Sequence, residues 1–317
     1  MKAIITKAYG PVEVLEIQEV EKPVIQDNEM LIRVHASSVN PVDWKIRRGD
    51  VKLLTGRKPP EILGADYSGT IVKAGKDVKN YKIGDAVFGL VHAFKGGAYA
   101  EFVKVKEEDT CPKPENLSFE QAASLPVVSL TAYQSLVHKG QLRRGHHVMV
   151  NGCSGGVGLS GVQIAKGLGC RVTGVCSTKN IEVAKKIGAD NIIDYTCEDI
   201  LKDKGAYDIF FDAVANQSFF KAKKTLKPGG IYITTLPSFQ SMVLAPFINV
   251  ISSRKIKKIM VSPGTKSAKD LNIIREMAER GNLIPVLEKI YPIEEIREAH
   301  AHSETGRVVG EIALKGF

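Results

Sequence analysis

The stretch VMVNGCSGGVGLSGVQIAKGLG places a cluster of glycines between an apolar run and a helical pattern. Two glycine spacings overlap in it: Gly152, Gly155 and Gly158 give GxxGxxG, and Gly156, Gly158 and Gly161 give GxGxxG. Glycine at a strand-to-helix turn lets backbone N–H groups and the positive helix end approach a pyrophosphate, which a Cβ would block. Because no Gly-Lys-Ser/Thr follows, the pattern is not a P-loop. A tight turn with incidental glycines is the alternative for the motif taken alone.

The residues after the next strand pattern decide which dinucleotide fits. RVTGVC ends directly before Ser177, Thr178 and Lys179, about 20 residues after the glycines, where a dinucleotide-binding fold recognises the adenosine ribose. A carboxylate there would bind the 2′-hydroxyl of NAD, whereas two hydroxyls and a cation suit the 2′-phosphate of NADP. Glu182 falls within the following helical pattern and is expected to face solvent. The sequence therefore favours NADP(H) over NAD(H).

Alternating strands and helices must position this loop. HHVMVN, RVTGVC and ADNIIDY are short apolar strand patterns, and the helical patterns VGLSGVQIAKGL and NIEVAKKIG lie between them. YDIFFDAV, QSFFKAKKTL and GGIYITTL continue the alternation. Such repeated βαβ units predict a parallel sheet covered on both faces. The predicted fold class is α/β, with a doubly wound parallel sheet of the Rossmann type.

The end of the first strand decides which glycine spacing holds the phosphates. HHVMVN should end near Val150, so Gly152 follows it almost at once, while Gly156 lies well beyond it. Gly161 then falls inside the helix, where a small residue permits close packing on the sheet. We expect the following residues to make the turn and the phosphate contacts: Gly152, Gly155, Gly156, Val157 and Gly158.

The first third of the chain has a different pattern of predicted elements from the middle. LIRVHASSV, SGTIVKAG, DAVFGLV and AYAEFVKV are short, partly alternating runs separated by turn residues. They predict a mostly antiparallel β domain. After residue 260, SAKDLNIIREMAERG and IEEIREAHAHS are helical patterns, and LIPVLEKIY and RVVGEIAL are strand patterns. These last elements either extend the parallel sheet or return to the first domain, and the patterns alone leave both open.

Composition fits a soluble globular protein of two domains, with 317 residues, 44% hydrophobic and 25% charged. Neither a targeting segment nor an apolar run of membrane-spanning length is expected. The net charge of +9 comes from scattered lysines, which favours a solvated basic face, with peripheral membrane association as the second interpretation. No long basic tract or RNA-binding motif occurs, so no specific nucleic acid partner is expected. Five cysteines without a CxxC spacing suit a reducing compartment, and we expect a cytoplasmic protein.

Taken together, these motifs resemble the zinc-independent quinone oxidoreductase branch of the medium-chain dehydrogenase/reductase superfamily. The matching segments follow the expected order along nearly the whole chain: SSVNPVDWKIRRGD, PPEILGADYSGTIVKAG, KIGDAVFG, GGAYAEFV, LPVVSLTAYQSL, NGCSGGVGLSGVQIAKGLG and TGRVVGEIAL. NPVDWK and CSTKN are most similar to the alkenal/enone reductases and to the chloroplast-envelope quinone oxidoreductase homologues.

The resemblance implies two domains and a place for the active site. Residues 1–122 would form a GroES-like β domain that residues 261–317 complete, and residues 123–260 would form the NADP-binding Rossmann domain. The active site would lie in the cleft between them and take a small-molecule enone or quinone. The family also implies a homodimer joined along the Rossmann sheet edge through GGIYITTL, and a monomer is the alternative.

The resemblance also assigns cofactor contacts. Lys179 takes the 2′-phosphate position, and Tyr195 matches a tyrosine that flanks this phosphate. Thr131 matches the threonine beside the nicotinamide, and Asn40 matches the asparagine at the junction of cofactor and substrate. Glu311 departs from the family, in which a lysine is frequent there. The expected NADP(H) site comprises Gly152, Ser154, Gly155, Gly156, Val157, Gly158, Ser177, Thr178, Lys179, Tyr195, Thr131, Asn40 and Leu236.

The positions that bind zinc in zinc-dependent relatives carry other residues here. Those relatives have a cysteine in the early loop and a His-Glu pair in GHExxG. This chain has Asn40 and Asp43 in the loop, and GADYSG at residues 64–69 in place of GHExxG. No set of nitrogen and sulfur ligands is left, so we expect no metal.

Without a metal, an alcohol has no Lewis acid to lower its pKa, whereas an electrophilic acceptor needs none. The oxygen of a reduced enone or quinone does need hydrogen-bond or proton donors. The candidates for this catalytic role are Lys45, Asn40 and Tyr67. A salt bridge from Lys45 to Asp43 or Asp66 is the competing interpretation. We expect Asp66 to be exposed and ionised, and to orient loops rather than donate a proton.

The leading hypothesis is a metal-free NADPH-dependent oxidoreductase that reduces enones, alkenals or quinones. A zinc-free alcohol dehydrogenase is the rival within the same fold. The rival from another class is an NADPH-binding protein whose main role is to bind RNA, a membrane surface or a protein partner.

Overall fold

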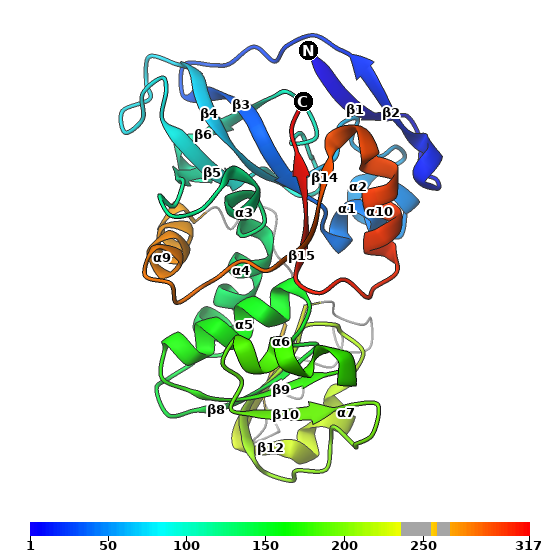
Figure 1. Ribbon diagram of the computed structural model, residues 1–317, viewed down its shortest axis with the longest axis vertical. Helices are drawn as coiled ribbons and strands as arrows, with labels where there is room; N and C mark the ends of the chain where they lie inside the picture. Colours follow the sequence, from blue (N-terminus) through cyan, green and yellow to red (C-terminus); the bar gives the residue numbers. More distant parts are fainter. Residues whose placement is uncertain (236–254, 259–266) are drawn as a thin grey trace. The chain divides into compact units, whose positions relative to one another are not determined.

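The computed structural model describes residues 1–235, 255–258 and 267–317, without the side chains of 255–258. Two compact units make up the chain. Unit 1 comprises Met1–Val127, Pro263–Gly281 and Pro285–Phe317, and unit 2 comprises Val128–Ser262 and Asn282–Ile284. The last elements of the chain therefore return to the unit that holds the N-terminus (Figure 1). Within the described ranges, no helix is long and apolar enough to cross a membrane.

Unit 2 is built on a six-stranded sheet whose strands all run parallel, in the order β10-β9-β8-β11-β12-β13. Its interior strands have nearly continuous buried runs, as expected for a sheet covered on both faces. Helices α5 and α6 pack on strands β8 to β10 (Figure 1). The bounds are β8 His147–Asn151, α5 Gly156–Gly167, β9 Arg171–Cys176, α6 Ile181–Lys186, β10 Asn191–Asp194, β11 Tyr207–Asp212, α7 Phe219–Ala222, β12 Leu226–Thr234 and β13 Lys255–Lys258.

This strand order reverses direction between β8 and β11, the first and fourth strands of the sheet along the chain. Ligands of open α/β sheets bind beyond the carboxyl ends of the strands at such a reversal. The glycine loop after β8 lies at this point, so the fold places it where a dinucleotide binds. The predicted doubly wound sheet is confirmed.

One expectation about the sheet edge is wrong: the segment GGIYITTL, which includes most of β12, does not form the edge. Instead β12 pairs with β11 on one side and with β13 on the other. Because its hydrogen-bonding groups are used within the chain, β12 is an interior strand, and the outermost strand on that side among the described residues is β13.

Unit 1 is organised around a seven-stranded, mainly antiparallel sheet in the order β14-β15-β3-β4-β5-β7, with β6 paired to β3. A second, two-stranded sheet pairs β1 with β2. The bounds are β1 Lys2–Thr6, β2 Leu15–Glu19, β3 Glu29–Ser38, α1 Pro41–Arg48, α2 Lys52–Thr55, β4 Asp66–Ala74, β5 Ala86–Leu90, β6 Phe102–Lys106, β7 Thr110–Pro112, α3 Phe119–Ala123, α9 Ala268–Glu279, β14 Leu287–Pro292, α10 Ile296–Glu304 and β15 Glu311–Lys315. Helix α4, Pro126–Tyr133, contains the boundary between the units.

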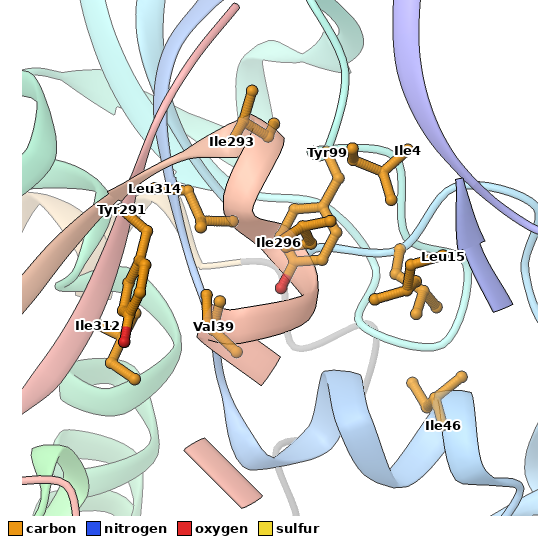
Figure 2. Packing of buried hydrophobic residues seen from close by; sticks show 12 residues of the cluster. Ile4, Leu15, Val39, Ile46, Tyr99, Tyr291, Ile293, Ile296, Ile312 and Leu314 are labelled. Carbon is orange, nitrogen blue, oxygen red and sulfur yellow. The ribbon is translucent and has the colours of Figure 1, made fainter. Parts of the chain in front are cut away.

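A buried apolar cluster attaches the C-terminal elements to the first third of the chain. Ile46 of α1, Ile296 of α10 and Ile312 of β15 belong to it, together with Ile4 and Tyr99 (Figure 2). All five side chains are at most 2% exposed. Burial of this much apolar surface fixes β15 beside β3, and therefore fixes which residues face each other across these strands.

Candidate functional site

The glycine loop connects β8 to α5 as the first spacing predicts. Strand β8 ends at Asn151, and α5 begins at Gly156 with Gly155 as its N-cap. Gly152 has a φ of +77°, and a Cβ on it would lie 2.6 Å from Val214 Cγ1. Only glycine meets both constraints, so the turn starts at Gly152.

Gly158 and Gly155 lack a side chain for different structural reasons. A Cβ on Gly158 would lie 2.1 Å from the carbonyl oxygen of Gly152, so this position closes the turn against the helix. A Cβ on Gly155 would meet only that same oxygen, at 3.9 Å, so the space above it is open. The first N–H groups of α5 have no acceptor within the helix. An open backbone cradle at a helix N-terminus fits the pyrophosphate of a dinucleotide.

Inside the helix, Gly161 has the packing role expected of it. A Cβ there would lie 3.0 Å from the ring of Phe211 on β11. The absence of a side chain therefore sets how closely α5 approaches the sheet, and Gly161 takes no part in the loop itself.

The residues after β9 form the second part of the site. Lys179 is exposed in the short helical turn Thr178–Asn180. The hydroxyl of Thr178 donates to Asp194 Oδ2 at 2.5 Å, and Asn180 Nδ2 donates to Ser154 Oγ at 2.9 Å. The side chain of Asn180 thus joins the glycine loop to the end of β9. The backbone N–H of Tyr195 donates to the carbonyl of Cys176, which holds Tyr195, 59% exposed, at the same edge.

Asp194 is a carboxylate at this edge that the sequence patterns did not single out. Hydrogen bonds from Thr178 and then from Thr196 lower the pKa of Asp194 to about 2. Thr196 donates to Oδ1 both from its backbone and from its hydroxyl. Because both oxygens already accept hydrogen bonds from threonines, Asp194 braces the turn.

A second network at the carboxyl edge was also missed. Asn151 Nδ2 donates to Asp212 Oδ1 at 2.8 Å, which links the ends of β8 and β11 across the point where the strand order reverses. Asp212 Oδ2 accepts from the hydroxyl of Tyr232 and from the backbone of Gln217. The only sequence signal was that Asn151 and Asp212 each end an apolar strand pattern. Thr131 lies in α4 and is 4% exposed, and Leu236 lies outside the described residues.

In unit 1, polar side chains gather where β3, β4 and β15 meet. Asn40 Nδ2 donates to Asp66 Oδ2 at 2.8 Å and to Ser38 Oγ at 3.0 Å, and Ser38 Oγ donates to Asp66 Oδ2 at 2.6 Å. The backbone of Val127 donates to Asp66 Oδ1 at 2.9 Å. Asp43 Oδ2 accepts from the backbone of Asn40 and caps α1. We call Ser38, Asn40, Asp43, Asp66 and Glu311 the Asn40 group.

Three carboxyl groups are buried in this group, and their pKa values rise accordingly. Burial, aided by the charge of Asp66, raises the pKa of Asp43 to about 7. Burial raises the pKa of Asp66 to about 6, against the hydrogen bonds from Ser38 and Asn40. Glu311 opens β15 and is 8% exposed, and burial followed by the charges of Asp66 and Asp43 holds its pKa well above the usual range. The expectation of an exposed Asp66 is wrong, because the side chain is 0% exposed.

The three catalytic candidates are placed differently. Both hydrogens of Asn40 Nδ2 are donated within the Asn40 group, so Asn40 offers its Oδ1, a buried acceptor with no partner among the described residues. Lys45 is half-buried in α1, 5.4 Å from the centroid of the Trp44 ring, and burial lowers its pKa. The described carboxylates Asp43 and Asp66 form no ion pair with it.

Tyr67 does not belong with these residues, and we withdraw it as a donor. Its hydroxyl lies 2.8 Å from Thr110 Oγ1 and donates to the carbonyl of Asp109. The ring is fully buried in an apolar cluster with Met30 and Val87. Tyr67 follows Asp66 on β4, so the alternation of the strand sends the two side chains to opposite faces of the sheet.

The described residues do not offer a ligand set for a catalytic zinc ion. In the described part of the chain, no three His, Cys, Asp or Glu side chains are placed to hold a metal. All five cysteines are free, and four of them are buried.

A sheet in this order, with an open glycine loop at its reversal, defines a dinucleotide-binding α/β protein. Comparisons with known proteins agree. A family model described as alcohol dehydrogenase GroES-like domain matches residues 26–115, and one described as zinc-binding dehydrogenase matches residues 187–314. The chain belongs to the medium-chain dehydrogenase/reductase family, in the branch of the quinone oxidoreductases and enone reductases.

Three similar proteins illustrate the relatives of this chain. NAD(P)H oxidoreductase RTN4IP1, mitochondrial, of Mus musculus is 33% identical, over 99% of this chain and 89% of its own. The 2-methylene-furan-3-one reductase of Solanum lycopersicum is 33% identical, over 99% of this chain and 79% of its own. The quinone oxidoreductase from Coxiella burnetii has a TM-score of 0.89 and 31% identity, with 100% of this chain and 99% of that one covered. The predicted family, fold class and oxidoreductase class are confirmed.

Proposed function

We propose that the protein is an NADPH-dependent reductase of α,β-unsaturated carbonyl compounds or quinones, and that it works without a metal. The observation that carries the proposal is the open glycine loop with an exposed cation, Lys179, beside the end of β9. The acceptor class is supported by relatives named for a furanone reductase and a quinone oxidoreductase.

The residues of unit 2 would hold the cofactor along the carboxyl edge of the sheet. The backbone from Gly155 to Gly158 would bind the pyrophosphate, and Lys179 with Ser177 would bind the 2′-phosphate. Asp194 at this edge is ionised and accepts hydrogen bonds from Thr178 and Thr196, so Lys179 would offset its charge as well as that of the phosphate. When bound, NADPH supplies the hydride that reduces the acceptor.

The residues of unit 1 would act on the acceptor. Lys45 would stabilise the negative charge that develops on the acceptor oxygen, an effect that its partial burial strengthens. Asn40 would contribute its free Oδ1 as an acceptor that orients a donor group of cofactor or substrate. Ser38 and Asp66 fix the rotation of that amide. Electrophilic acceptors need no Lewis acid, which agrees with a donor set that does not suit zinc.

The test is a panel of oxidation rates with NADPH and with NADH. The acceptors are short alkenals, bulky enones and soluble quinones, and the reverse assay offers simple alcohols with NADP⁺. We expect turnover with an enone or a quinone, a preference for NADPH, and rates unchanged by a zinc chelator. Alcohol oxidation that a chelator abolishes would contradict the proposal, and so would RNA binding without any turnover.

We also propose a cytoplasmic protein, which the five free thiols support because they suit a reducing compartment. The protein is proposed to be a homodimer or a monomer without a specific nucleic acid partner. Light scattering of the purified protein distinguishes the two states.

A further inference from the structure

Two neighbouring leucines on α2 are turned into solvent. Leu53 is 102% exposed and Leu54 is 55% exposed, and Leu53 is the most exposed large hydrophobic residue in the described part of the chain. Single exposed apolar side chains are common on protein surfaces. Two in succession on one turn, with the first fully exposed, form a small apolar projection.

This projection is held by an ordered turn. The hydroxyl of Tyr9 lies 2.7 Å from Thr55 Oγ1 and donates to the carbonyl of Gly56 at 2.9 Å. The ammonium of Lys52 lies 4.8 Å from the centroid of the Tyr9 ring. These contacts attach one side of α2 to the N-terminal segment, so the leucines on the other side stay exposed.

Unpaired cations flank the leucines. Lys52, Arg57 and Lys58 are exposed, and no acidic side chain within the described ranges forms an ion pair with them. Residues 45–58 contain six basic side chains, but Arg47 is buried and pairs with Glu304, and Arg48 lies near Asp50 and Glu304. The exposed cations left without a carboxylate partner among the described residues are Lys52, Arg57 and Lys58. We call Lys52, Leu53, Leu54, Arg57 and Lys58 the α2 surface.

Exposed cations elsewhere on the molecule are of two kinds. Lys166, Lys202 and Lys227 each pair with an aspartate or a glutamate, whereas Lys82 and Lys186 form no ion pair with a described carboxylate. What distinguishes the α2 surface within the described ranges is that its cations adjoin two consecutive exposed large hydrophobic side chains.

We propose that the α2 surface docks the protein on a bilayer that contains anionic phospholipid. Leu53 and Leu54 would enter the interface between headgroups and acyl chains, and Arg57 and Lys58 would lie among the phosphates. Lys52 would add its charge from its place beside the Tyr9 ring. A protein partner is less well matched, because two side chains on a four-residue helix offer far less area than a stable protein interface buries. A nucleic acid would bind the cations but gives no place to the leucines. The proposal does not depend on the acceptor that the enzyme reduces.

The test is cosedimentation of the full-length protein with vesicles of phosphatidylcholine, with and without phosphatidylglycerol. We expect binding to the anionic vesicles only, and release as the salt concentration rises. The double variant Leu53→Ser/Leu54→Ser and the triple variant Lys52→Gln/Arg57→Gln/Lys58→Gln should each lower the partition coefficient by about tenfold or more. All five side chains are on the surface, so both variants should keep the NADPH affinity of the wild type.

The matched control is Lys82→Gln/Ile83→Ser, which removes a lysine and an apolar side chain that is 66% exposed elsewhere on unit 1. This variant should bind vesicles as the wild type does. The proposal is overturned if the wild-type protein stays in the supernatant, or if the leucine variant binds as well as the wild type. A change of oligomeric state on replacing the leucines, without vesicle binding by the wild type, would assign the surface to a second copy of the chain instead.

Discussion

Asn40 shows how a buried carboxylate can set the orientation of an amide. Asp66 Oδ2 faces Asn40 Nδ2 and Ser38 Oγ at 2.8 and 2.6 Å. Turning the amide over would bring its oxygen against an ionised carboxylate, which costs free energy in a buried place. The pKa of Asp66, raised to about 6, leaves it mainly ionised at neutral pH. The acceptor Oδ1 therefore points away from Asp66.

The first prediction concerns this orientation. Asp66→Asn replaces the carboxylate by an amide that accepts and donates, so Asn40 can adopt either rotation. We expect kcat to fall about tenfold, while the dissociation constant of NADPH changes little, because the cofactor loop belongs to unit 2. Steady-state kinetics and fluorescence titration measure the two quantities. Ser68→Ala, which removes a buried hydroxyl on the same strand, is the control, and an equal loss of kcat in it would assign the effect to general damage of β4.

The second prediction concerns the choice of dinucleotide. Lys179→Ala removes the exposed cation after β9, and we expect the dissociation constant of NADPH to rise about tenfold or more while that of NADH stays the same. Isothermal titration with both cofactors measures this. Lys186→Ala, which removes another exposed lysine in α6, should affect neither. If Lys179→Ala weakens both cofactors equally, Lys179 does not read the 2′-phosphate.

At the scale of elements, the turn from β8 to α5 contains glycines that the fold requires and one glycine that it does not require. Gly152 and Gly158 are required by the chain itself, because a Cβ on either meets Val214 or the carbonyl of Gly152. Gly155 has an ordinary φ of −87° and open space beside it. Because the fold itself does not require glycine at position 155, we infer that the missing side chain leaves room for a bound ligand.

The third prediction uses this contrast. Gly155→Ala should change the free energy of unfolding by less than about 1 kcal/mol, because alanine tolerates this backbone. It should nonetheless weaken NADPH binding about tenfold or more, because the new methyl group enters the space for the phosphates. Gly158→Ala should instead cost about 3 kcal/mol of stability, since its methyl group overlaps the loop. Thermal unfolding and NADPH titration of both variants check this, and unchanged NADPH affinity in Gly155→Ala would remove Gly155 from the site.

At the scale of the whole molecule, the Asn40 group makes stability depend on pH. The pKa of Asp43 rises from its ordinary value of 3.8 to about 7 in the folded protein. Below the ordinary value, folded and unfolded chains both hold the proton. Between the two values, only the folded chain holds it, so stability falls as the pH rises through this range. The loss is complete above about pH 7, where the buried carboxyl is ionised.

The fourth prediction follows from this loss of stability with rising pH. Asp43→Asn cannot ionise, so between about pH 5 and about pH 8 the variant should gain about 2 kcal/mol of stability relative to the wild type. Urea unfolding at the two pH values measures the difference. Asp27→Asn changes an aspartate whose side chain is 64% exposed, and it should follow the wild type at both pH values. A constant difference between Asp43→Asn and the wild type would show that Asp43 stays ionised when folded.

The sequence alone determined the local features that depend on neighbouring residues. A strand pattern, three spaced glycines and a helical pattern follow one another directly, so the loop between strand and helix and its glycine register were predictable from backbone sterics and periodicity. The alternation of strand and helix likewise predicted the parallel sheet. The order of motifs predicted the family, because those segments match along nearly the whole chain.

Only the tertiary structure decided what depends on residues far apart in the chain. Asp66 is buried because β3, β4 and Val127 surround it, whereas its sequence neighbours suggest an exposed loop. Tyr67 points the other way because strand alternation is fixed by the sheet that β4 joins. Glu311 meets two aspartates only after β15 returns beside β3. The burial of a side chain and its distance to other charges depend on residues from many parts of the chain. Local sequence patterns therefore do not predict them.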